Sequence, residues 1–106
     1  TGAEGEGESA SSPRRLQEPE LIAQVKQLLA EGMTQRGEKE LLELLSHADR
    51  RVRLEAQWEL AERGTNSFTG LLTTAKQSKV QLARIHSLWA IGQIARPLKR
   101  GYTFGA

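Results

Sequence analysis

The chain has 106 residues, enough for one small domain, and contains no cysteine, which excludes disulfides, cysteine zinc sites, thiolate nucleophiles and C-x-x-C-H haem attachment. It has no apolar run long enough to cross a membrane and no signal-peptide pattern at its first residues, so we expect no membrane contact from this segment. Its net charge of +2 is unevenly divided: residues 18–63 hold ten acids and seven bases, whereas residues 64–106 hold six bases and no acid.

The chain divides into three parts. Residues 1–17 are rich in glycine, serine and glutamate and contain one large aliphatic residue, Leu16, which predicts a disordered leader. Residues 18–96 have helical periodicity and no strand-like alternation, which predicts an all-α domain. Its helices are expected at about 18–31, 38–46, 50–63, 67–77 and 79–95. Residues 97–106, which open with a proline, predict a flexible tail.

The third and fifth expected helices carry more apolar residues than one buried face needs. Asp49 is well placed to cap the third helix, because its carboxylate can accept from the free amides of the next turn, and Gly64 can end that helix. The third helix has apolar residues on two sides, and the fifth, 79–95, is apolar nearly all round. The fifth helix therefore belongs in an interior or associates with a second copy.

The chain also contains an internal repeat. A shift of 31 positions superposes Arg53 on Arg84, Trp58 on Trp89, Leu60 on Ile91 and Leu41 on Leu72. The second and third helices, and the fourth and fifth, therefore look like copies of one hairpin, and stacked hairpins predict a short α-solenoid of about five helices. The expected core consists of Leu41, Leu45, Val52, Ala56, Trp58, Leu60, Leu72, Ile85, Leu88, Trp89 and Ile91.

Three stretches carry a family resemblance: VKQLLAEG at 25–32, LLSHADRRVRLEAQWELAERG at 44–64 and LARIHSLWAIGQIAR at 82–96. They resemble HEAT repeats, in which an Asp caps the second helix and a Val-Arg pair opens it. They are also similar to the HEAT region of bacterial, planctomycete-type membrane-bound dehydrogenase-domain proteins. The chain lacks the propeller and the haem-attachment motif of that family, so no redox residue is carried over.

The resemblance implies HEAT-like hairpins stacked in a right-handed array, with no catalytic activity of their own. In that family the repeats lie between a quinoprotein dehydrogenase-like propeller and a cytochrome c module of a large secreted protein. The expected role is therefore a scaffold that docks neighbouring domains of the same parent chain, or another protein. The resemblance also implies a periplasmic or secreted location.

The residues themselves offer no candidate for catalysis, metal binding or cofactor binding. His47 and His86 have no third ligand spaced to join them, so we expect a capping role for His47 and a backbone or carboxylate partner for His86. The carboxylates follow helical spacing on polar faces, and no serine lies in a nucleophile motif.

A candidate binding surface is basic. Its members are Arg50, Arg51, Arg53, Lys79, Arg84, His86 and Arg96. An acidic protein partner or neighbouring domain is the preferred interpretation. The alternative is a HEAT-like module that binds nucleic acid through the basic C-terminal half, although aromatic residues for stacking are few.

Overall fold

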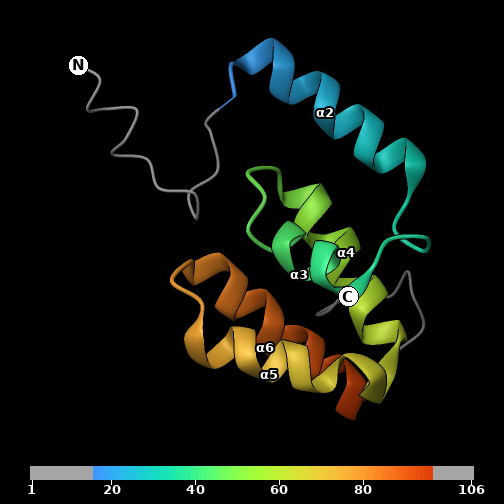
Figure 1. Ribbon diagram of the computed structural model, residues 1–106, viewed down its shortest axis with the longest axis vertical. Helices are drawn as coiled ribbons and strands as arrows, with labels where there is room; N and C mark the ends of the chain where they lie inside the picture. Colours follow the sequence, from blue (N-terminus) through green and yellow to red (C-terminus); the bar gives the residue numbers. More distant parts are fainter. Residues whose placement is uncertain (1–15, 97–106) are drawn as a thin grey trace, which may run out of the picture.

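The structure, a computed structural model, describes residues 16–96. Within this part all regular structure is helical, which confirms the all-α class (Figure 1). The elements are α2 (Glu18–Glu31), α3 (Glu38–Leu44), α4 (Arg50–Glu62), the 3-10 turn η1 (Gly64–Ser67), α5 (Phe68–Gln77) and α6 (Gln81–Ala95). Residues 1–15 of the expected leader, and the expected tail at 97–106, lie outside the described residues.

The helix ends follow local side-chain chemistry. Asp49, the expected cap of α4, accepts a hydrogen bond from the Arg51 amide at 2.8 Å. α6 begins at Gln81, two residues later than expected, because Ser78 and Val80 have extended backbones and the Ser78 hydroxyl accepts from the Val80 amide at 3.1 Å. α3 ends at Leu44, two residues earlier than expected.

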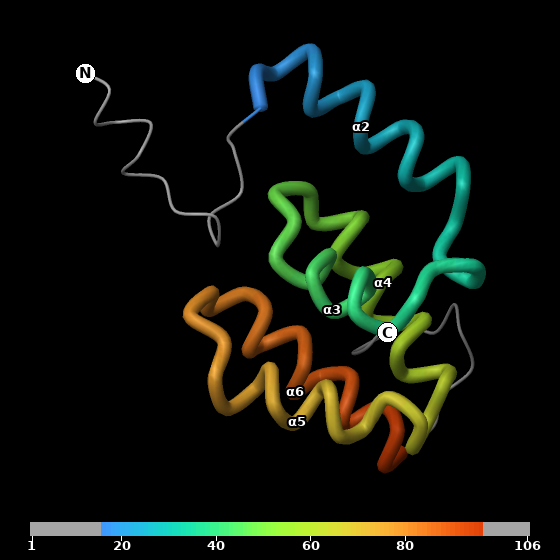
Figure 2. The backbone as a smooth tube through the Cα atoms, viewed as in Figure 1, coloured from blue at the N-terminus to red at the C-terminus, as the bar shows by residue number. Residues whose placement is uncertain are grey.

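Two helical hairpins, α3–α4 and α5–α6, pack side by side (Figure 2). α3 lies against α5 and α4 lies against α6, while α2 packs on the other side of the first hairpin, against α4. Gly70 allows the close approach of α5 to α3. A Cβ at Gly70 would lie 2.9 Å from Leu42 Cδ1 and closer still to the Glu38 side chain. The central helix is α4, which contacts α2, its hairpin partner α3, and α6 of the second hairpin.

The apolar core lies between the two hairpins and beneath α2. Its largest fully buried aliphatic side chains come from α3, the residue after α3, α4 and α5: Leu41, Leu45, Val52, Leu60 and Leu71. Ala56 of α4 and Ala83 and Ala90 of α6 complete the buried apolar cluster. Of the residues expected in the core from the sequence, Leu41, Leu45, Val52, Ala56 and Leu60 are fully buried.

Three residues expected in the core are instead exposed. Leu72 is 40%, Leu88 58% and Trp89 54% accessible. They lie on sides of α5 and α6 that no other element of the described chain covers, so the expectation of burial is wrong for them. Trp58, Ile85 and Ile91 are half-buried.

Candidate functional site

Four buried polar side chains connect α4 to α6. Arg53 and Gln57 lie one turn apart on α4, and His86 and Gln93 lie two turns apart on α6. All four are at most 9% exposed. Because unpaired polar groups are costly in an interior, a row of them needs a complete set of partners.

Hydrogen bonds run through this row in one direction. Arg53 Nε lies 3.2 Å from His86 Nε2, and a guanidinium can only donate, so His86 Nε2 accepts. The proton of His86 is therefore on Nδ1, which donates to Gln57 Oε1 at 2.7 Å. The Gln57 amide nitrogen donates in turn to Gln93 Oε1 at 2.8 Å. The row ends at Gln93 Nε2, which is buried without a hydrogen-bond partner.

This arrangement requires a neutral His86. Burial lowers the pKa of His86, and the positive charges of Arg53 and Arg50 lower it further. A proton on Nε2 would place two donors against each other at the Arg53 contact. The sequence predicts a backbone or carboxylate partner for His86, and this is wrong: the partners are a glutamine, an arginine and the Trp89 ring, which His86 meets at 5.5 Å in an edge-on geometry.

Arg53 also holds the loop before its own helix. Its Nη1 donates to the carbonyls of His47 and Ala48 at 2.7 and 3.0 Å. In the second hairpin, Arg84 Nη1 donates to the carbonyl of Ser78 at 2.7 Å. Both arginines reach the carbonyl six residues before them, so the 31-position pairing of Arg53 with Arg84 corresponds to one repeated structural role.

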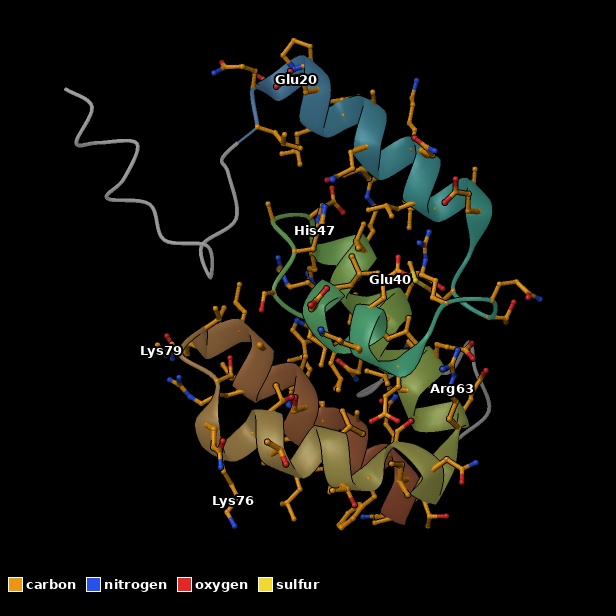
Figure 3. All side chains as sticks on the ribbon, in the orientation of Figure 1. Glu20, Glu40, His47, Arg63, Lys76 and Lys79 are labelled. Atoms are coloured by element: carbon orange, nitrogen blue, oxygen red, sulfur yellow. The ribbon has the colours of Figure 1, made fainter. Side chains whose placement is uncertain are left out.

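His47 connects the first hairpin to α2. Its Nδ1 accepts from the Asp49 amide at 2.9 Å, so its Nε2 carries the proton and donates to Gln24 Oε1 on α2 at 2.6 Å. Burial lowers the pKa of His47, which favours this neutral form. Figure 3 shows His47 in the loop that faces α2. The histidine therefore caps the turn, as the sequence suggests, and also joins two elements.

The seven residues of the predicted basic surface do not form one surface. Arg53 and His86 are buried in the row of hydrogen bonds, and Arg84 is half-buried. Arg51 is exposed but pairs with Asp49 at 3.0 Å, and its hydrogen bond lowers the pKa of the Asp49 carboxyl. Arg50, Lys79 and Arg96 are exposed.

The second hairpin exposes large apolar side chains to solvent. Five exposed apolar residues lie on its two helices. They are Phe68 and Leu72 on α5, and Leu82, Leu88 and Trp89 on α6. At about 100° per residue, Leu82 and Trp89 share one side of α6, toward His86, and Leu88 lies on another side with Arg84. We call Phe68, Leu72 and Leu88 the α5–α6 face, because exposed large apolar side chains mark a surface that binds another element.

The first hairpin shows what this face is equivalent to. On α3, Glu38 and Leu42 meet Gly70 of the second hairpin. A shift of 30 residues places the buried Leu41 on the buried Leu71, and it places Glu38 and Leu42 on Phe68 and Leu72. On the second helices, the shift of 31 places Gln57, which bonds α6, on Leu88. The α5–α6 face is thus the counterpart of the surface that the second hairpin covers on the first.

Other site types are not evident in the described residues. Among residues 16–96, no three histidine or acidic side chains gather where they could hold a metal ion. No helix in this part of the chain is long and apolar enough to cross a membrane. One hollow, of about 370 Å³, lies between α3 and α5 beside Leu42 and Thr73.

Comparison with known proteins finds no match: no family model, curated protein or solved structure is significantly similar to this chain.

Proposed function

We propose that the chain is a non-catalytic, HEAT-like helical-repeat module that serves as a scaffold and docks a protein or a neighbouring domain. Its hairpins would stack in a right-handed array, with α3 and α5 in one layer and α4 and α6 in the other. The paired helices and the repeated loop contacts of Arg53 and Arg84 support this arrangement.

One observation carries the docking role. The second hairpin covers Leu42 and Gln57 of the first, while the equivalent Leu72 and Leu88 are apolar and exposed. In a repeat array each hairpin buries its surface against the next one, so an uncovered end has free energy to gain from a further element. A second copy of this chain, associating through α6, is one such element.

The family resemblance extends the proposal to a setting. In a large secreted protein with a quinoprotein dehydrogenase-like propeller and a cytochrome c module, this segment would hold the two at a distance. Dehydrogenation would then belong to the parent protein, and the location would be periplasmic or secreted.

Nucleic-acid binding is the second candidate, favoured by one observation. Residues 64–96 carry Lys76, Lys79, Arg84 and Arg96 and no acid. If phosphates bind there, affinity for a DNA duplex falls linearly with salt on a log–log plot, and Lys79→Glu reduces the slope by about one. Apolar side chains between these cations favour docking of a protein instead.

The docking role can be tested by adding a hairpin. A second copy of residues 64–96 inserted after Arg96 should cover the α5–α6 face, raise the free energy of unfolding in urea and protect Trp89 from acrylamide quenching. The matched control carries Leu88→Glu in the first copy, which should remove both effects. An added hairpin that leaves stability and quenching unchanged would show that the face does not dock a neighbour.

A further inference from the structure

We infer that the α5–α6 face binds a partner helix whose apolar stripe is flanked by carboxylates, one of which accepts a hydrogen bond from Arg84. This inference rests on the proposed docking function and specifies the chemistry of the partner. It follows from three features of the second hairpin: its apolar face, the position of Arg84 and the sign of the surrounding charge.

The α5–α6 face spans two neighbouring helices. Phe68 and Leu72 lie one turn apart on α5, and Leu88 lies one turn after Arg84 on α6. Two adjacent helices with apolar residues at these spacings form a groove-and-ridge surface of the type that receives an amphipathic helix. On the first hairpin the equivalent surface receives helices, α5 against α3 and α6 against α4, so the fold itself shows helices packed on this surface.

Arg84 lies at the position from which, in the first hairpin, an arginine donates a hydrogen bond to the next hairpin. Arg53, its equivalent, uses Nη1 for the preceding loop and Nε for His86 of the next hairpin. Arg84 makes the same loop contact through Nη1. By this equivalence, Arg84 Nε lies where the next element must present an acceptor, and a carboxylate is the acceptor that a guanidinium binds most strongly.

The charge of the second hairpin favours an acidic partner over a second copy of the chain or residues 97–106. Lys76, Lys79, Arg84 and Arg96 are the only charged residues between Gly64 and Arg96. Figure 3 shows Lys76 and Lys79 near the connection between α5 and α6. A second copy using the same face would bring these cations against their own counterparts. Residues 97–106 contain Lys99 and Arg100 and no acid, and are disfavoured for the same reason.

The experiment compares two synthetic probes. Both are amphipathic helices with the same leucine stripe, flanked by glutamates in one and by lysines in the other. The 106-residue chain carries Trp58→Phe, so that Trp89, exposed and next to Leu88 in α6, is the only tryptophan and reports on binding to that helix. We expect the glutamate probe to shift Trp89 emission to the blue and the lysine probe to bind at least about tenfold more weakly at physiological salt.

Variants locate the contact. Leu88→Glu, at an exposed position, should abolish binding of the glutamate probe, and Arg84→Gln should weaken it. Because Arg84 also holds a loop, the exposed pair Lys76→Gln and Lys79→Gln provides a second test of charge that does not disturb the fold. Matched controls on α2, Ile22→Glu and Lys26→Gln, change an exposed apolar residue and an exposed cation, and should leave affinity unchanged.

Four results would overturn the inference. If both probes bind equally through Leu88, the docking role stands but the acidic partner is wrong. If neither probe binds while an added hairpin protects Trp89, the face accepts a repeat but not an isolated helix. If the chain dimerises in light scattering and Leu88→Glu abolishes the dimer, a second copy is the occupant. If acrylamide does not reach Trp89 in the free chain, another segment of the chain already covers it.

Discussion

His86 makes the contact between the hairpins sensitive to acid. Its pKa is lowered in the folded chain by burial and by Arg53 and Arg50, relative to the ordinary value of 6.5. The unfolded chain therefore takes up the proton more readily than the folded chain. The stability that neutral His86 provides is complete above pH 6.5 and is lost as the pH falls below that value.

We therefore expect the free energy of unfolding, measured in urea, to fall between about pH 7.5 and pH 5. His47 contributes in the same direction, since burial also lowers its pKa. His86→Gln should remove part of the dependence, and the double variant with His47→Gln should remove most of it. A pH dependence that survives both substitutions would mean that other groups cause it.

Gln57 is the second residue whose role can be measured. It accepts from His86 and donates to Gln93, so Gln57→Leu leaves a donor and an acceptor unpaired in the interior. We expect a loss of about 1–3 kcal/mol in the free energy of unfolding. Gln77→Leu, at an exposed position, is the control and should change stability little.

A double-mutant cycle tests whether Gln57 and Gln93 contribute to stability jointly or independently. Gln93→Leu removes the group that Gln57 Nε2 donates to, together with the unpaired Gln93 Nε2. The double variant should therefore cost less than the two single changes added together. Strict additivity would indicate that Gln57 and Gln93 do not interact.

At the scale of the helices, Gly92 has a backbone conformation that alanine adopts readily, and Gly64 has one that alanine rarely adopts. Gly92 lies inside α6 with open space where a Cβ would project, so Gly92→Ala should stabilise the chain by about 0.5–1 kcal/mol. Gly64 follows α4 with φ of +64°, in the left-handed region, so Gly64→Ala should destabilise it by about 1 kcal/mol. Thermal unfolding of the two variants should move the midpoint in opposite directions.

The helices were predictable because their signals are local. Apolar spacing, the Asp49 carboxylate and Gly64 act within a few residues, so the five helices follow from the sequence with shifts of about two residues at the ends of α3 and α6. Those shifts come from turns, such as the Ser78–Val80 bond, that compete with the helix. The 31-residue pairing of Arg53 with Arg84 also carries through to matching contacts.

The contacts between hairpins were harder to predict. Gln57 and Gln93 look like surface residues when read singly, and only their position among apolar residues of α4 and α6 signals a buried role. A repeat pattern gives the place of Leu72, Leu88 and Trp89 in a hairpin, but not whether another hairpin covers them. For the same reason, the sequence did not predict that Arg53 is buried whereas Arg50 is exposed.

At the scale of the whole molecule, α2 is the element most weakly attached. Val25 is its only buried residue, Leu21, Leu28 and Leu29 are partly buried against the core, and a side-chain hydrogen bond joins Gln24 to His47 of the first hairpin. Its C-terminal end is held more firmly. Arg36 donates to the Gly32 carbonyl at 2.9 Å, and Arg63, after α4, donates to the Arg36 carbonyl at 2.7 Å.

This asymmetry predicts the order of opening. Amides of α2 should exchange with deuterium faster than those of α4 and α6, since an element with little buried apolar surface opens at low free energy. Val25→Ala should lower protection in α2 by about tenfold, equivalent to ~1.4 kcal/mol, and leave α4 and α6 unchanged. If protection falls equally in all helices, α2 unfolds together with the hairpins and the chain is a single cooperative unit rather than a stack of separable layers.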